Sequence, residues 1–139
     1  MRLTVKKTLA LSYAVDVPEE KKAKDIDEIV NDPEIGIVVE TMGGVEPAYT
    51  FVKAMLEAGK QVATSNKNLV AAKGAELIKI ARDHNVNFQF EASVGGGIPI
   101  IRPLNKCLTA DEIEEMLCDS NLLLETLCAV RCEEEFCCE

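Results

Sequence analysis

The chain has 139 residues, of which 47% are hydrophobic and 28% charged, and its formal net charge is −9. This length allows one domain with its own core, and the composition is ordinary for a soluble globular protein. No apolar run approaches the roughly 20 residues of a membrane span, and no signal peptide is recognisable. No surplus of basic residues favours nucleic-acid binding. We therefore expect a cytoplasmic protein that binds neither a membrane nor nucleic acid.

The first predicted elements lie between residues 2 and 59. Residues 2–5 favour a short strand, and a short helix begins at Asp25 and ends at residues 31–33, because proline cannot continue the helical hydrogen bonds. The apolar run at residues 35–39 is typical of a strand that is buried on both faces. Pro47 then starts a helix that ends near a glycine.

Two more strands, at residues 61–64 and 86–90, flank a helix predicted over residues 71–82. Alternating helices and strands with short connections imply a parallel sheet with helices on both faces. Ligands bind such sheets at the carboxyl ends of the strands. Thr41 and Lys67 fall at two of these ends, so both are candidate binding residues.

A glycine-rich segment follows the third of these strands. Glu91 precedes three consecutive glycines at residues 95–97, and Pro99 fits the first turn of a further helix. Glycines let the backbone approach a ligand closely and let carbonyl groups turn toward a bound ion. The simpler alternative is a tight turn, just as the simpler interpretation of Lys67 is a solvated loop residue.

Six segments together resemble the cofactor-binding domain of homoserine dehydrogenase over residues 26–111. They occur in the family's order and spacing: DID at 25–27, NDPEI at 31–35, VVETMGG at 38–44, LEAGK at 56–60, TSNK at 64–67 and EASVGGGIPIIRP at 91–103. The resemblance implies a Rossmann-type parallel sheet with flanking helices. It also implies an oxidoreductase that interconverts L-homoserine and L-aspartate 4-semialdehyde with NAD or NADP, in the biosynthesis of threonine, methionine and isoleucine.

The resemblance also assigns site residues by position. Lys67 corresponds to a lysine that lies close to cofactor and substrate and is assigned a role in proton transfer, and Thr41 to a contact on the nicotinamide side of the cofactor. Backbone carbonyls that hold a monovalent cation, usually sodium, correspond to Glu91, Val94, Gly96 and Ile98. The complete enzyme of the family is expected to be a homo-oligomer with a small-molecule substrate, and the choice between NAD and NADP stays open.

These residue types suit the implied chemistry. Hydride transfer to an aldehyde places negative charge on its oxygen, and a lysine can stabilise that charge or deliver a proton. Burial can bring the pKa of a lysine toward neutrality, where proton exchange is efficient. Carbonyl oxygens are hard ligands that suit a hard cation.

Two departures from the family pattern affect the functional interpretation. No Gly-x-Gly-x-x-Gly turn is present, since the first glycine is Gly36, so the chain lacks the first βα unit and its pyrophosphate cradle. After residue 110 the sequence stops resembling the family, so the substrate half is not recognised. We interpret the chain as a fragment that is inactive alone, from a truncated gene, a reading-frame error or an assembly error. The alternative is a degenerate paralogue, a non-catalytic module that associates with full-length subunits.

The carboxyl-terminal part differs in composition from the rest. Residues 1–110 balance 14 basic with 14 acidic residues, whereas residues 111–139 hold ten acidic residues, one basic residue and five of the six cysteines. We therefore divide the chain into a truncated NAD(P)-binding domain at 1–110 and an acidic tail at 111–139. The tail is expected to form an amphipathic helix. A soft-metal site at Cys128, Cys132, Cys137 and Cys138 is the other interpretation, although the spacing is not Cys-x-x-Cys.

Overall fold

The computed structural model describes residues 18–95, 99–103 and 107. The chain divides into two compact units, Met1–Gly36 and Ile37–Glu139. The strand predicted at residues 2–5, the proposed boundary at residue 110, and the acidic tail with its predicted helix and cysteines lie outside the described residues. No helix within the described ranges is long and apolar enough to cross a membrane.

The described part of the first unit, residues 18–36, contains two short helices, η1 (Glu19–Lys21) and α1 (Asp27–Val30). Helix α1 begins at Asp27, two residues after the predicted start at Asp25. The Asp25 carboxylate precedes the helix and accepts a hydrogen bond from the backbone N–H of Glu28 at 3.1 Å. The helix ends at Val30, and Asn31 is its C-terminal cap, two residues before the proline. The Asp32 carboxylate then accepts from the Glu34 N–H at 2.9 Å, which forms the turn that leads out of the unit.

The second unit is a parallel sheet of three strands, with the helices on its connections. The strands are β1 (Ile37–Glu40), β2 (Gln61–Thr64) and β3 (Phe88–Gln89), and they lie in the order β1-β2-β3. Helix α2 (Ala48–Glu57) connects the first pair of strands, α3 (Lys67–Asp83) connects the second pair, and α4 (Ala92–Gly95) follows β3. The predicted Rossmann-type α/β arrangement of parallel strands and flanking helices is confirmed.

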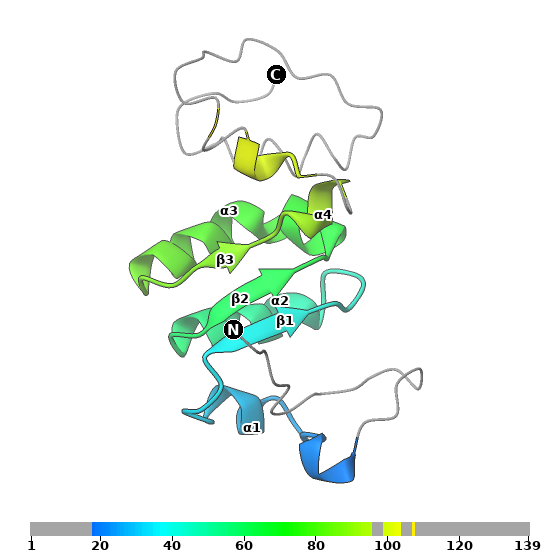
Figure 1. The fold of residues 1–139 in the computed structure, drawn as a ribbon, viewed down its shortest axis with the longest axis vertical. Helices are drawn as coiled ribbons and strands as arrows, with labels where there is room; N and C mark the ends of the chain where they lie inside the picture. Colours follow the sequence, from blue (N-terminus) through cyan, green and yellow to red (C-terminus); the bar gives the residue numbers. More distant parts are fainter. Residues whose placement is uncertain (1–17, 96–98, 104–106, 108–139) are drawn as a thin grey trace. The chain divides into compact units, whose positions relative to one another are not determined.

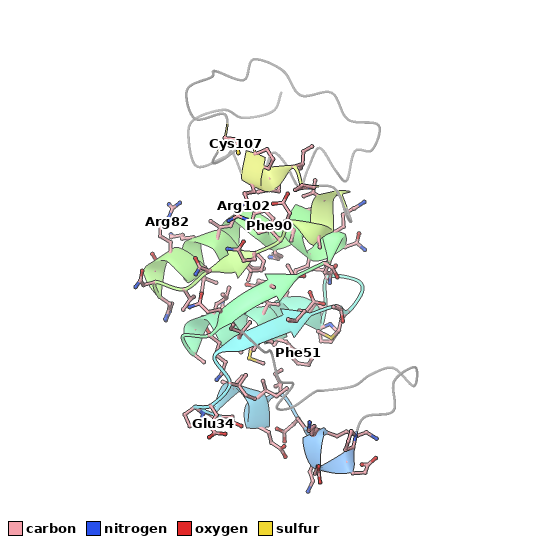
Figure 2. The ribbon with its side chains drawn as sticks, in the orientation of Figure 1. Glu34, Phe51, Arg82, Phe90, Arg102 and Cys107 are labelled. Atoms are coloured by element: carbon pink, nitrogen blue, oxygen red, sulfur yellow. The ribbon has the colours of Figure 1, made fainter. Side chains whose placement is uncertain are left out.

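Helices α2 and α3 pack against each other on the same face of the sheet (Figure 1). Right-handed crossovers that proceed in one direction along a parallel sheet place their helices on one side, which explains this layering. The core between the layers is aliphatic, and its most buried side chains include Leu56, Leu69, Val70 and Leu77. At the end of β3, Phe90 is buried and its ring lies 5.3 Å from that of Phe88 (Figure 2).

The prediction that residues 35–39 form a strand buried on both faces is wrong. Ile37 is 53% and Val39 68% exposed. The expected helices on both faces are also not found, because α2 and α3 lie together and no described element of this unit covers the other face. A strand beneath a single helical layer keeps only alternate side chains in the core, so a continuous apolar run overstated the burial.

The boundaries of three other elements differ from the prediction. Helix α3 begins at Lys67, four residues before the predicted start, because Asn66 caps it there. The strand predicted at residues 86–90 is only Phe88–Gln89, and the chain then turns into the short helix α4 instead of passing directly into a glycine turn. The end of α2 is as predicted, since Gly59 adopts a φ of +77°, the left-handed conformation that favours glycine after a helix.

A polar cluster joins α2 to α3 on the surface of the second unit. The Tyr49 hydroxyl donates to the Glu76 carboxylate at 2.5 Å, and Lys73 lies 3.6 Å from the other carboxylate oxygen. The Lys73 amine also lies 4.9 Å from the centre of the Tyr49 ring, within the range of a cation–π contact. The pKa of the Glu76 carboxyl is lowered mainly because the Tyr49 hydrogen bond favours its charged form, and Lys73 and Lys53 add to this effect.

This cluster predicts a pH dependence of stability. A carboxyl whose pKa is lower in the folded chain stabilises the fold above its unfolded-state pKa, and this contribution disappears as the pH falls through the folded-state pKa. The free energy of unfolding should therefore decrease on acidification, and Tyr49→Phe should reduce the part of the decrease that Glu76 causes. Urea unfolding of both chains at pH 7 and pH 3 measures this. Identical decreases in the two chains would contradict the assignment.

Candidate functional site

The candidate site lies where β1 and β2 end side by side. The register pairs Glu40 with Thr64, the last residues of these parallel strands. Thr41 therefore follows one strand directly, and Lys67 follows the other after two residues. The structure thus brings the two predicted residues to the same edge of the sheet, which is the edge where ligands bind in parallel α/β folds.

A buried hydrogen-bond network links these two strand ends. Glu40 is 5% exposed, and one of its carboxylate oxygens accepts from the Thr64 hydroxyl at 2.5 Å. The other carboxylate oxygen accepts from the backbone N–H of Met42 at 2.5 Å. The Thr64 oxygen in turn accepts from the backbone N–H of Asn66 at 2.9 Å. Because a buried carboxylate is tolerated only when it is well hydrogen-bonded, the network explains how Glu40 is accommodated.

Asn66 places the start of α3 against the loop that follows β1. Its side-chain oxygen accepts from the Leu69 N–H at 3.1 Å, which caps the 17-residue helix. Its side-chain amide donates to the Gly44 carbonyl at 2.7 Å. Gly44 has a φ of +80°, a conformation that L side chains rarely adopt. A single buried side chain therefore fixes both the helix start and the glycine loop.

Replacing Asn66 by alanine is expected to destabilise the second unit by about 1–2 kcal/mol, the usual cost of a lost N-terminal cap. Asn66→Asp is the matched control, because aspartate restores the acceptor for Leu69 N–H while it removes the donor to Gly44. Urea unfolding followed by circular dichroism should give the aspartate variant a free energy of unfolding between those of the original chain and the alanine variant. Equal stabilities for the alanine variant and the original chain would contradict the capping role.

Lys67 is the first residue of α3 and is half-buried. The interpretation of this lysine as a loop residue is therefore wrong, since it lies in a helix. Its amine forms no ion pair with any residue that the structure describes. The neighbouring loop carries the exposed Thr41, and a side-chain carbon added at Gly43 would meet no atom within 4 Å. The edge thus presents an amine, a hydroxyl and an open stretch of backbone.

The predicted cation site is described only in part. Glu91 and Val94 lie within the described residues, whereas Gly96 and Ile98 lie outside them. The Glu91 carbonyl accepts from the Val94 N–H at 3.3 Å, a long contact that leaves a lone pair for another partner. No group of three His, Cys, Asp or Glu side chains that could hold a metal occurs among the described residues.

The Glu91 side chain has a role that the sequence did not predict. Its carboxylate accepts hydrogen bonds from three successive backbone N–H groups, those of Ile100, Ile101 and Arg102, the last two at 2.9 Å. The carboxylate therefore links residue 91 to residues 100–102. Glu40, Thr64 and Asn66 were also missed as site residues. The signal that could have identified them is a polar residue at the end of each apolar strand.

A parallel sheet with helical connections and polar residues at the carboxyl ends of its strands defines part of a nucleotide-binding α/β domain. The family described as "Homoserine dehydrogenase, NAD binding domain" matches residues 2–91. The chain belongs to this family, and Thr41, Lys67 and Glu91 lie within the matched residues.

Relatives and solved structures agree with this assignment. Homoserine dehydrogenase of Lactococcus lactis is 47% identical over 92 residues, 66% of this chain and 22% of that protein. The Bacillus subtilis enzyme is 37% identical over 119 residues, 83% of this chain and 28% of that protein. A homoserine dehydrogenase structure from Thiobacillus denitrificans has a TM-score of 0.62 at 46% identity and covers 66% of this chain and 21% of that one. The chain thus spans about a quarter of the length of the curated relatives it matches.

Proposed function

We propose that this chain supplies the nicotinamide-side edge of the cofactor site in a homoserine dehydrogenase. The enzyme interconverts L-homoserine and L-aspartate 4-semialdehyde with NAD or NADP, and we place it in the cytoplasm as a homo-oligomer. The observation that carries the proposal is the hydrogen-bonded frame of Glu40, Thr64 and Asn66, which holds Thr41 and Lys67 at one sheet edge. A hyperthermophilic archaeal homoserine dehydrogenase in complex with NADPH, with a TM-score of 0.52 at 34% identity, supports the cofactor class.

The residues at this edge fit a dinucleotide. The open backbone at Gly43 leaves room for a flat ring to lie against the loop, because no side chain is present and none nearby fills the space. The exposed hydroxyl of Thr41 can hydrogen-bond to a carboxamide group, and the amino end of α3 favours negative charge. When bound, the nicotinamide accepts or supplies the hydride.

Lys67 is proposed to handle the proton that accompanies hydride transfer. An ammonium group on Nζ can donate a proton to the oxygen of a reduced aldehyde or stabilise the negative charge that develops there. Its place in the first turn of a capped helix limits the positions that the amine can reach. Thr41 is proposed to orient the cofactor and takes no part in the proton transfer.

We also propose that the backbone carbonyls of Glu91, Val94, Gly96 and Ile98 hold a sodium ion. Support comes from the Glu91 carboxylate, which accepts hydrogen bonds from the Ile101 and Arg102 N–H groups and so holds residue 91 beside residues that follow these positions in the sequence. Carbonyl oxygens suit a hard cation. A sodium ion that binds the folded chain but not the unfolded chain would stabilise the fold by mass action. The melting temperature of the chain should therefore be higher in sodium chloride than in choline chloride. Equal melting temperatures would contradict the sodium site.

A chimaeric enzyme tests the proposed activity. The 92-residue segment of this chain that matches the Lactococcus lactis homoserine dehydrogenase would replace its counterpart in that enzyme. Homoserine-dependent reduction of NAD and NADP is then followed at 340 nm, and the proposal predicts turnover with at least one of them. A folded chimaera without turnover, beside an active L. lactis enzyme, would overturn the proposal.

The second candidate is a non-catalytic module that binds full-length homoserine dehydrogenase subunits. The exposed side chains of Ile37 and Val39 favour it, because neighbouring exposed aliphatic residues on a strand are suited to a protein contact. Sedimentation of this chain with the L. lactis enzyme distinguishes the candidates. A complex of fixed stoichiometry that Val39→Lys abolishes would support the module.

A further inference from the structure

We propose that Glu40 is a positioning residue of the candidate site. Its carboxylate fixes the loop that carries Thr41 and, through Thr64 and Asn66, the helix turn that carries Lys67. The consequence of this inference for cofactor binding rests on the proposed function. Its structural part, the hydrogen-bonded link between the two segments, can be tested without any ligand.

The first step is the unusual environment of Glu40. Its neighbour Val39 is 68% exposed, whereas Glu40 itself is 5% exposed, so the one acidic residue of β1 occupies the buried face. Burial of a charged carboxylate is unfavourable unless hydrogen bonds replace its hydration. Each of its two oxygens has a separate donor, so Glu40 serves as an acceptor for two segments at once.

The second step is the direction of the hydrogen bonds. The Thr64 hydroxyl has a single proton, which it donates to Glu40, and its oxygen is therefore free to accept from the Asn66 N–H. A carboxylate at position 40 is the group that lets both bonds form, because it only accepts. A glutamine would bring one acceptor oxygen and one NH₂ donor. Either the Met42 N–H or the Thr64 hydroxyl would then lose its acceptor.

The third step is the closure of the network around the proposed site residues. The bond from Met42 N–H fixes the backbone directly after Thr41. The Asn66 amide reaches back to the Gly44 carbonyl at 2.7 Å, so the loop is held at both of its ends. The loop and the first turn of α3 therefore form one hydrogen-bonded unit with Glu40 at its base.

A direct role for Glu40 as an acid or base is a weaker interpretation. A general base must come within hydrogen-bond reach of the proton that it removes. Glu40 is buried and both of its oxygens are already engaged, whereas Thr41, Gly43 and Ser65 at this edge are exposed. The geometry therefore assigns Glu40 to the support of the site and leaves its chemistry to other groups.

Amide hydrogen exchange of the ¹⁵N-labelled 139-residue chain tests the link. Glu40→Leu should accelerate exchange of the Met42 amide, and Thr64→Val that of the Asn66 amide, by about tenfold, since each of these amides loses its acceptor. Glu40→Gln, which keeps one acceptor oxygen, is the milder variant and should not exceed Glu40→Leu at Met42. Thr64→Ser keeps the hydroxyl and should restore the original rates. Exchange of core amides in α3 serves as the internal reference. An unchanged exchange rate of the Met42 amide in Glu40→Leu would overturn the proposal.

Titration of the same samples with NADPH tests the consequence for the site. The shift changes at the Thr41 and Lys67 amides should be weaker in Glu40→Gln than in the original chain. The matched control is Gln61→Ala, which removes the acceptor of the Asn87 N–H (2.7 Å) at the opposite end of β2. This control should lower the melting temperature but keep the NADPH response. A Glu40→Gln chain that responds to NADPH like the original would overturn the positioning role.

The NADPH titrations of the original chain and of its variants separate this proposal from the proposed function. If the original chain shows no NADPH response, the proposed function fails, and the exchange rates alone decide the role of Glu40 in holding the two segments. If the original chain responds and Gln61→Ala weakens the response as much as Glu40→Gln does, general loss of stability explains both, and the proposal is overturned.

Discussion

Lys67→Ala in the chimaeric enzyme is expected to lower kcat by roughly 10²–10⁴-fold, the usual contribution of a positioned acid or base. The physical reason is that the oxygen of the reduced aldehyde would lose both its proton donor and the positive charge that stabilises it. Thermal unfolding should change little, because the Lys67 amine forms no ion pair with a described residue. Steady-state kinetics with saturating homoserine and cofactor measure the effect.

The matched control for this prediction is Lys73→Ala in the same helix. Lys73 pairs with Glu76 on the surface, 3.6 Å away, and lies almost two turns after the capped end. We expect kcat of the control to stay within about twofold of the original chimaera, since an exposed ion pair contributes little to stability. A Lys67→Ala chimaera that turns over as fast as the Lys73→Ala control would rule out a catalytic role for Lys67.

Leu77→Ala is expected to reduce the free energy of unfolding of the second unit by about 2–5 kcal/mol, the usual cost of this change in a core. Leu77 lies in α3 and is fully buried. A domain of this size is typically stable by only about 5–15 kcal/mol, so the substitution should remove a large part of the total. Urea unfolding of the 139-residue chain, followed by circular dichroism, gives the value.

Val39→Ala is the matched control for the core substitution. Both changes shorten an aliphatic side chain, but Val39 is largely exposed. Its loss should cost less than about 1 kcal/mol, because little apolar surface is returned to water. If the Leu77→Ala chain does not fold, Leu77→Met provides a milder test with an expected cost below about 1.5 kcal/mol. Similar costs for Leu77→Ala and Val39→Ala would contradict the assigned core.

The order of elements and the position of the site were accessible from the sequence. Strong local signals, namely the proline at position 47, the glycine at position 59 and the apolar strands, identified α2, β1 and β2. The carboxyl ends of parallel strands meet at one edge, so Thr41 and Lys67 could be placed together before the fold was seen.

The supporting residues of the site could not be predicted in the same way. The Asn66 cap at the start of α3 is a local bond that the sequence could have indicated, but the bond from its amide to the Gly44 carbonyl forms only when the loop after β1 lies within reach. The burial of Glu40 depends on the register that places it beside Thr64. The exposure of Val39 depends on which face the two helices cover. Each of these is a tertiary property that the local pattern does not contain.

The most direct test of the central claim is a ¹H–¹⁵N correlation spectrum of the 139-residue chain during titration with NADPH. The account predicts that shift changes concentrate in the loop after β1 and the first turn of α3, including Thr41 and Lys67. Amides at the opposite ends of the strands, such as those of Gln61 and Asn87, should not respond. Changes confined to that opposite end, or no changes at all, would contradict a cofactor site at this edge.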